Sequence, residues 1–330
     1  MKPGDRVEDS RHDASEEALH RQERLGLLFA ALCVLNGAFV PAFAKLTTER
    51  GGALFVAAIT TVFGGLFAAL VLGLRGELKQ LVAPGRRGYL ALVGMLGTAL
   101  AFYLFFQGAR RTSAIDAALC LQIEPLYSML AAWLVLGHRP SARRVLGLAV
   151  LLCGILLAIA GPDYAPSSGT WLLLLTPLCW QLSHLVALGR LATVTPQVLA
   201  GARYVYGGGL LLLLWLISAG PATAPASFGS LLPLLALQGI VLSYCGTLLW
   251  YQTIRRLDLG RATSIVVPSI PLLSVAASFA LLGEVPTLRQ ALGLGLVVSG
   301  VFLFVAAPRA IARRRHEAFV RRSGRPEFAD

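Results

Sequence analysis

Charged side chains are scarce in this chain of 330 residues. Asp, Glu, Lys and Arg make up only 14% of it, whereas apolar residues make up 56%. A soluble domain has roughly 25% charged residues, which keep its surface in contact with water. The shortage of charge therefore excludes an ordinary soluble protein and indicates a chain that lies mostly in lipid.

The sequence also lacks the motifs of several catalytic and cofactor-binding classes. It has no G-x-x-x-x-G-K-[ST] loop for nucleotide phosphates, no H-E-x-x-H zinc motif and no G-x-S-x-G nucleophile motif. We therefore expect no cofactor, no metal site and no catalytic residues. An intramembrane enzyme and a scaffold protein stay as less favoured alternatives of other classes.

Cysteine occurs five times, always inside an apolar run and never with C-x-x-C spacing. The observed positions of the cysteines therefore do not indicate a zinc site. We interpret all five as small buried hydrophobic residues. They are Cys33, Cys120, Cys153, Cys179 and Cys245.

Long apolar segments dominate what is present. A bilayer core of about 30 Å needs roughly 20 apolar residues of helix, and ten segments meet or approach that length. We predict membrane spans at 25–46, 53–74, 88–109, 114–136, 145–161, 169–189, 197–219, 231–254, 262–282 and 288–307.

The 29 Lys and Arg residues divide unevenly between the two sides of this helix array. If the N-terminus is inside, 23 lie on the inner side, five on the outer side and one, Arg203, within a span. Cytoplasmic loops retain positive charge, so we predict a multi-pass cell-membrane protein with both tails, 1–24 and 308–330, in the cytoplasm. The basic segment 309–325 adjoins the last span, which favours membrane lipid over nucleic acid as its partner.

An internal repeat relates the two halves at a constant offset of 146 residues. Each copy holds five spans, an odd number, so the second copy crosses the membrane in the opposite sense to the first. We predict an all-α integral membrane fold of ten transmembrane helices in two inverted five-helix repeats, 25–161 and 169–307. Equivalent pairs are Pro125 and Pro271, Ser128 and Ser274, Gly137 and Gly283, Gly147 and Gly293, and Gly154 and Gly300.

The end of the first repeat contains GARRTSA at 108–114, QIEPL at 122–126, LGHRP at 136–140 and LGLAVLLCG at 146–154, and the second has LGEVP at 282–286. These segments resemble the end of an EamA-type domain of the drug/metabolite transporter superfamily. One departure is His138, where such domains usually carry Glu and where the second repeat keeps Glu284. We expect this change to affect helix capping more than transport.

The resemblance implies a transporter of small metabolites, often amino-acid-like or amphipathic compounds that leave the cell. It also implies a central cavity formed mainly by the first, third, fourth, sixth, eighth and ninth spans, with the fifth and tenth at the periphery. A small-molecule substrate is therefore the expected partner, and a homodimer is left open.

Glu124 lies about ten residues into the fourth span, which places it near the middle of the bilayer. An ionisable group at that depth indicates a functional site by default. Glu124 is our candidate for proton coupling, or for binding a substrate amine. The alternative is a protonated or hydrogen-bonded carboxyl beside a helix break at Pro125.

In the sixth span, Trp180, Gln181 and His184 share one helical face, which suits either a planar or cationic ligand or an interhelical hydrogen-bond patch. For Arg203, we favour a side chain that extends to the inner membrane interface over one paired with an anion in the cavity. Gly207, next to two further glycines, indicates close helix packing more than a flexing point.

The eighth span carries a hydroxyl-bearing stripe, Tyr244, Thr247 and Tyr251, that should face a cavity or another helix. In the ninth, Pro268 and Pro271 predict a kink that frees carbonyl groups to line the pathway. The complete set of predicted substrate-binding residues is Asn36, Tyr103, Gln107, Gln122, Glu124, Trp180, Gln181, His184, Tyr244, Thr247, Tyr251 and Ser269.

Together these features predict a secondary transporter of small metabolites across the cytoplasmic membrane. We expect an exporter of amino-acid-like or amphipathic compounds that works by alternating access and is driven by a proton or substrate gradient. Uptake or exchange by the same fold remains the alternative within transport.

Overall fold

The computed structural model describes residues 3–134, 137, 139–160, 167–218, 220, 223–226, 228–257 and 259–305. Every regular element within these residues is helical. Ten helical segments among them are long and apolar enough to cross a membrane, which confirms the predicted number of spans. The predicted C-terminal tail and His138 lie outside the described residues.

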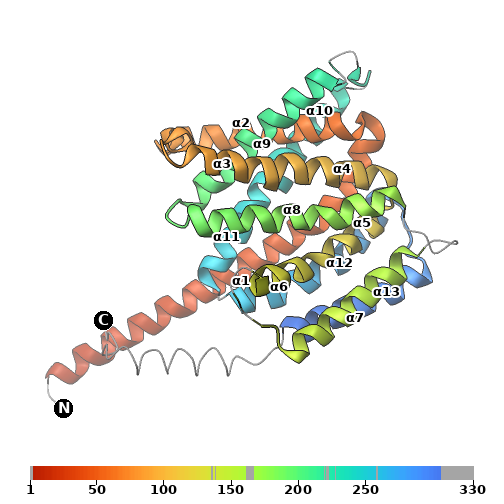
Figure 1. The fold of residues 1–330 in the computed structure, drawn as a ribbon. Helices are drawn as coiled ribbons and strands as arrows, with labels where there is room; N and C mark the ends of the chain where they lie inside the picture. The colour runs from red at the N-terminus through yellow and green to blue at the C-terminus, as the bar shows by residue number, and fades with distance from the viewer. Residues whose placement is uncertain are drawn as a thin grey trace.

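The helices follow one another in two sets of five spans (Figure 1). The first set comprises α1 (Pro3–Gly51), α2 (Ala53–Leu74), then α3 (Arg87–Gly94), η2 (Met95–Leu100) and α4 (Ala101–Arg111) as one span, then α5 (Ala114–Cys120), η3 (Leu121–Ile123) and α6 (Glu124–Leu134) as one span, and α7 (Ala142–Ile159). A short helix, η1 (Leu78–Val82), joins the second and third spans.

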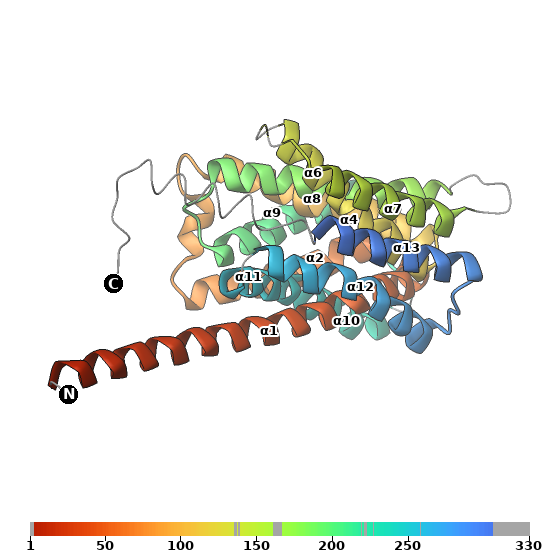
Figure 2. The same cartoon turned by 90° about the horizontal axis from the view of Figure 1, so that it is seen from below.

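The second set comprises α8 (Ser168–Arg190), α9 (Pro196–Ser218), then α10 (Phe228–Leu237), η5 (Gln238–Cys245) and α11 (Gly246–Arg256) as one span, α12 (Leu259–Leu282) and α13 (Leu288–Val305). α1 extends well beyond the rest of the helix array at its N-terminal end (Figures 1 and 2).

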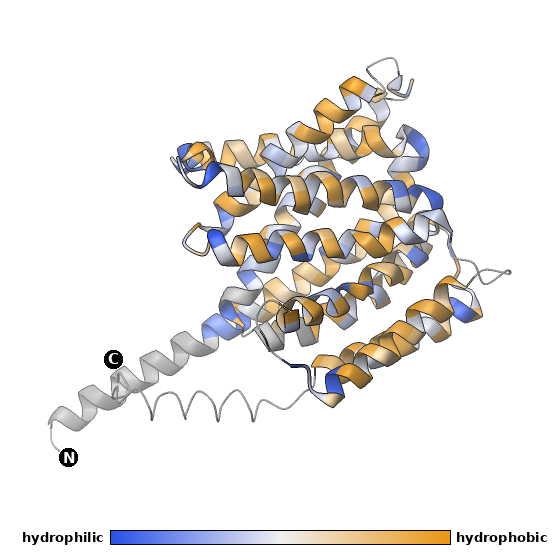
Figure 3. Cartoon of the chain, viewed as in Figure 1, coloured by the Kyte–Doolittle hydropathy of each residue, from blue (hydrophilic) through white to orange (hydrophobic). Residues whose placement is uncertain are grey.

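Apolar side chains cover the outside of the array as well as its core. Large hydrophobic residues such as Leu70 and Leu74 are 56% and 82% exposed, as expected for helices whose surroundings are hydrocarbon. Figure 3 shows hydrophilic residues gathered mostly at the helix ends, with hydrophobic residues along their lengths. Cys153 is exposed, so its predicted burial is wrong; its place on α7 is one where an apolar thiol meets lipid.

The packing of α7 against α13 reveals how the two repeats are related. A Cβ on Gly147 would lie 2.9 Å from the carbonyl oxygen of Gly300, and one on Gly154 would lie 2.7 Å from that of Gly293. Gly147 is the repeat equivalent of Gly293, and Gly154 that of Gly300. The contact of Gly147 with Gly300 is therefore repeated, with the repeats exchanged, as the contact of Gly293 with Gly154. Such reciprocal contacts are those of a two-fold axis. The two helices run antiparallel, as inverted repeats require.

These two helices are the fifth and tenth spans, and they lie together at one edge of the array (Figure 1). Their peripheral position is the one that the family resemblance implied. They contact the remaining helices through a cluster built around Leu119, Leu151 and Val297, all fully buried.

The third span of each repeat contains a π-helical segment in the same place. η2 covers 95–100 and η5 covers 238–245, and the offset of 146 residues superimposes η2 on 241–246. A π turn inserts an extra residue into a helix, bends it and leaves a carbonyl group without its usual partner. Both repeats therefore expose polar backbone at the same depth.

The fourth span is broken by η3 directly before Glu124, so the predicted helix break beside Pro125 is confirmed. In the ninth span, α12 stays one helix across Pro268 and Pro271. The hydroxyl of Ser269 donates to the carbonyl oxygen of Ile265, at 2.6 Å. This bond lies within the helix.

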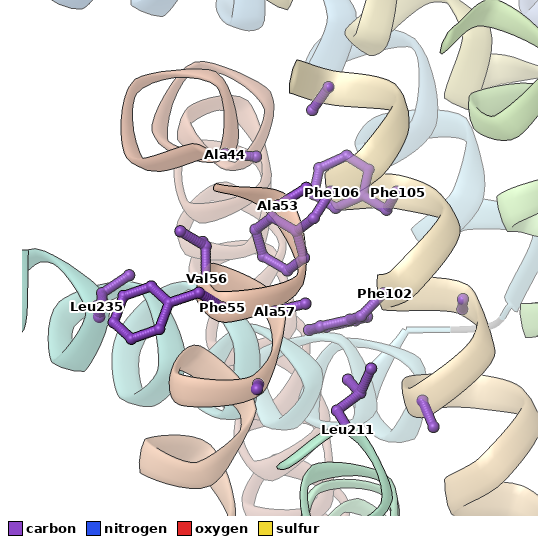
Figure 4. Packing of buried hydrophobic residues seen from close by; sticks show 14 of the residues in the cluster. Ala44, Ala53, Phe55, Val56, Ala57, Phe102, Phe105, Phe106, Leu211 and Leu235 are labelled. Atoms are coloured by element: carbon purple, nitrogen blue, oxygen red, sulfur yellow. The ribbon is translucent and has the colours of Figure 1, made fainter. Parts of the chain in front are cut away.

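An aromatic core joins the second, third and seventh spans. Phe55 and Val56 of α2 lie near Phe102 and Phe106 of α4, with Leu211 of α9 beside them (Figure 4). Such rings prefer edge-to-face contacts, and Phe102 and Phe106 stack in that way with centroids 5.7 Å apart. This core holds the helices that carry the polar residues described next.

Glycines let the second and seventh spans approach closely. A Cβ on Gly65 would lie 2.8 Å from the carbonyl oxygen of Tyr204, and one on Gly208 would lie 2.8 Å from that of Thr61. Gly207 is equally crowded, by Gly94 and Thr98, whereas Gly209 faces open space. Close packing, as predicted, accounts for two of the three consecutive glycines.

Candidate functional site

Glu124 and Gln181 join the two repeats near the middle of the membrane. The side-chain amide of Gln181 on α8 donates to Oε1 of Glu124 on α6, at 2.8 Å. Glu124 is only partly buried despite its depth, and its second oxygen makes no hydrogen bond within the described residues. The pair therefore offers one free carboxyl oxygen at the interface between the copies.

Arg203 lies beside this pair, and its predicted extension to the inner interface is wrong. Its side chain is 9% exposed, and Nη2 donates to the carbonyl oxygen of Gly97 in η2, at 2.7 Å. The extra residue of the π turn leaves polar backbone at that point, which draws the guanidinium into the protein. Its charge acts electrostatically on Glu124 and His184.

In each repeat, the backbone in or just before the π segment accepts a hydrogen bond from a polar side chain on the first span of the other repeat. Asn36 on α1 donates from Nδ2 to the carbonyl oxygen of Val241 in η5, at 2.8 Å. Ser183 on α8 donates to the carbonyl oxygen of Val93, just before η2, at 3.2 Å. Ser183 is equivalent to residue 37, next to Asn36. The two contacts are thus counterparts under the inverted symmetry.

The predicted hydroxyl stripe of the eighth span faces Tyr204 on α9. The Tyr204 hydroxyl and Thr247 Oγ1 are 3.1 Å apart, and the ring of Tyr244 lies edge-on to that of Tyr204. Tyr103, Trp180 and Tyr251 pack against the same cluster. Tyr204 directly follows Arg203 on α9, so one helix carries both the aromatic ring and the charged group.

Several buried polar atoms make no hydrogen bond within the described residues, and three of them belong to side chains named above: Trp180 Nε1, Arg203 Nε and the Tyr244 hydroxyl. Such atoms are uncommon, because each loses its bonds to water without replacement. Others are spread through the helix array, on Thr60, Thr98, Trp215, Arg256, Ser274 and Ser278. The unpartnered Nε of Arg203 is the one that belongs to a charged group beside Glu124 and Gln181.

Two predicted residues lie apart from this group. Gln107 lines a cavity of about 420 Å³ formed where α1 meets α2, together with Arg110 and Trp215. By the predicted topology, this cavity opens on the outer side. Gln122 is buried and donates to the carbonyl oxygen of Ala118 one turn back, at 3.3 Å.

A second cross-repeat contact lies at that same end of the array. The carboxylate of Glu284 accepts from the backbone N–H groups of Ala114 and Ile115, at 3.0 and 3.2 Å. Gln290 donates to Asp116 Oδ1, at 2.8 Å. The loop before α13 thereby caps the N-terminus of α5. Glu284 therefore caps a helix of the other repeat, whereas the expectation for His138, its counterpart in the first repeat, lies outside the described residues.

Sequence reasoning did not select three residues of this network: Ser183, Arg203 and Gln290. Serine is common in membrane helices, so Ser183 gives little signal. Arg203 gave a strong signal, since it is an arginine within a span, but its depth alone did not show which way it faces. Gln290 lies near a helix end, where glutamine is unremarkable.

Ten spans in two inverted sets, with polar side chains where the sets meet, are the architecture of an inverted-repeat transporter. The chain is a multi-pass membrane protein. It belongs to the EamA-like transporter family, which matches residues 24–160 and 167–306. This is a family of transporters and not of enzymes, and a small molecule is accordingly the substrate.

Two curated relatives illustrate the similarity. A protein of Streptantibioticus cattleyicolor named "Probable terminal-alkyne amino-acid exporter" is 29% identical over 230 residues, covering 68% of this chain and 75% of the relative. The "Uncharacterized transporter YyaM" of Bacillus subtilis is 25% identical over 247 residues, covering 72% and 80%. A solved crystal structure that is 22% identical superimposes with a TM-score of 0.60, covering 88% of this chain and 98% of the other, and supports the fold alone.

Proposed function

We propose that this chain exports amino-acid-like compounds across the cytoplasmic membrane in exchange for protons, by alternating access between its two repeats. The observation that carries the proposal is the Glu124–Gln181 hydrogen bond, which places a carboxyl between the inverted copies. The printed name of the Streptantibioticus relative, an amino-acid exporter, supports the substrate class. Both termini lie in the cytoplasm in this proposal, in keeping with the distribution of Lys and Arg.

Glu124 is the group that couples the two fluxes. A carboxyl in hydrocarbon is costly when it is charged and unpaired, so it takes up either a proton or a cationic partner. The ammonium group of an amino acid supplies such a partner. Because both compete for one carboxyl, release of the substrate outside lets a proton bind, and release of that proton inside lets the next substrate bind.

The π segments supply the moving parts. Asn36 and Ser183 each tie the first span of one repeat to the third span of the other. Rocking of one repeat against the other lengthens one of these contacts while it preserves its counterpart. The remaining predicted ligands, among them Trp180, His184 and Tyr251, line the substrate site in this proposal. A homodimer stays a prediction.

The test uses proteoliposomes with a pH gradient and radiolabelled L-norvaline, a linear apolar amino acid, as the probe. The wild-type protein should drive L-norvaline against its gradient, in the direction opposite to proton flow. Glu124→Gln should abolish this pH-driven flux. Glu77→Gln is the matched control, because Glu77 lies in a loop and pairs with Arg75, and it should behave as wild type.

The outcomes separate the parts of the proposal. If Glu124→Gln keeps the L-norvaline flux driven by the pH gradient, the proposed coupling role of Glu124 is wrong. Flux of L-norvaline in the same direction as protons would replace export with uptake. No flux of L-norvaline in the wild type would refute the substrate class.

A further inference from the structure

We propose that Arg203 binds the carboxylate of the transported compound, so that the site recognises a zwitterion by both of its charges. This inference rests on the proposed export of amino-acid-like compounds. It adds Arg203 to the substrate-binding residues. The family resemblance did not suggest this role, and the position of Arg203 along its span favoured a place at the membrane interface.

The hydrogen bonds of Arg203 leave most of its donors free. A guanidinium carries five N–H groups in a planar fork, and the described contacts of Arg203 satisfy one of them, through Nη2 and Gly97. Nε is buried without a partner. A planar fork with unused N–H groups suits a carboxylate, which accepts two parallel hydrogen bonds.

The charge of Arg203 is also not neutralised by an ion pair. Within the described residues no carboxylate forms an ion pair with Arg203, and Glu124 is hydrogen-bonded to Gln181 instead. An uncompensated charge within a membrane span is strongly unfavourable. An anion bound to Arg203, with its own ammonium on Glu124, would neutralise both charges at once.

Gly97 and Ser183 hold the guanidinium in position. A Cβ on Gly97 would lie 3.1 Å from Arg203 Nε and 2.5 Å from Ser183 Oγ. Only glycine leaves room for both side chains against η2. The π turn therefore places the fork of Arg203 on the same interface between the repeats as Glu124, Gln181 and His184.

The aromatic cluster around Tyr204 accounts for the rest of such a substrate. Tyr204 follows Arg203 on α9, the ring of Tyr244 in the eighth span lies edge-on to that of Tyr204, and Tyr251 packs against the same cluster. Aromatic faces contribute apolar contact and a few hydroxyl groups. An amino acid with an apolar side chain matches this combination of one cation, one anion and an aromatic surface.

The experiment compares two probes that differ only in the carboxyl group: L-norvaline, and L-norvalinamide, which keeps the ammonium but lacks the carboxylate. Counterflow of each is measured in proteoliposomes with wild type, Arg203→Gln and Arg203→Lys. Arg203→Gln should lower L-norvaline counterflow roughly tenfold or more, the loss expected for charge-assisted hydrogen bonds, and leave L-norvalinamide unchanged. The L-norvaline counterflow of Arg203→Lys should lie between that of the wild type and that of Arg203→Gln.

Arg190→Gln is the control for loss of a positive charge, because Arg190 lies exposed at the end of α8 over the ring of Tyr89. It should transport both probes as wild type does. An equal loss for both probes in Arg203→Gln would show that Arg203 only holds η2 in place, and would overturn the inference. Unchanged transport of L-norvaline would overturn it as well.

A second readout does not depend on transport. The melting temperature of the purified proteins is followed as each probe is added, since a ligand raises it by binding the folded state. Stabilisation by L-norvaline but not L-norvalinamide, lost in Arg203→Gln, supports the site. If that occurs without flux in vesicles, the export proposal alone fails. If neither probe stabilises the wild type and no flux occurs, both fail.

Discussion

Glu284→Ala tests the contact that ties the two repeats together at the end of the array where α5 begins. The carboxylate of Glu284 accepts two hydrogen bonds from the first N–H groups of α5. Alanine removes both acceptors. The two N–H groups then have no hydrogen-bond partner within the helix, because no helical turn precedes them. The variant should therefore unfold more readily than the wild type.

The size of the effect follows from those two bonds. Loss of a helix cap costs about 1 kcal/mol, and loss of a negative charge at a helix N-terminus adds about 0.3 to 1 kcal/mol. The side chain is only partly buried, so the larger values for fully buried charged groups do not apply. A total of about 1.3 to 2 kcal/mol corresponds to a melting temperature lower by about 3 to 8 °C.

The measurement is thermal unfolding of the detergent-purified protein. Glu49→Ala is the matched control, because Glu49 is also acidic but is exposed and pairs with Lys45 one turn away, at 3.1 Å. Such surface pairs contribute about 0.5 kcal/mol or less, so this variant should melt close to the wild type. Equal melting temperatures for the two variants would refute the capping argument.

Two further predictions concern contacts between the repeats. Gly300→Ala should destabilise the protein by about 1 to 3 kcal/mol, because its Cβ would meet the backbone nitrogen of Leu151 on α7. Gly295→Ala on the same helix is the control, because Gly295 faces open space and its replacement should be neutral. Similar melting temperatures for the two variants would contradict the close packing of α13 against α7. Asn36→Ala should lower the free energy of unfolding by about 1 to 3 kcal/mol, because the carbonyl of Val241 loses its donor. Ser218→Ala loses only a bond within its own helix and should lower it less. A larger loss of stability in Ser218→Ala would contradict the role of Asn36.

The spans could be predicted because their signal is local. Each needs only a run of apolar residues and a charged boundary, and both are visible in the sequence. The repeat could be predicted for the same reason, since the equivalent glycines and prolines keep one offset. The reciprocal contact of Gly147 with Gly300 then follows from symmetry, once the two helices are known to touch.

The candidate site could be predicted only in part, because it depends on which helices meet. Glu124 and Gln181 were both selected for their depth, but 57 residues separate them and nothing local shows that they pair. Arg203 was assigned to the interface because its distance along the helix was known and its direction was not. The π turns that attract it are not visible in the hydropathy pattern.

The inverted symmetry also makes the differences between the repeats informative. Within η5 the carbonyl of Val241 accepts from Asn36, whereas the backbone in and just before η2 accepts from both Ser183 and the charged Arg203. A charged donor forms the stronger hydrogen bond to a carbonyl. The contacts around η2 should therefore resist separation more than those around η5. Two states related by exchange of the repeats would then differ in energy.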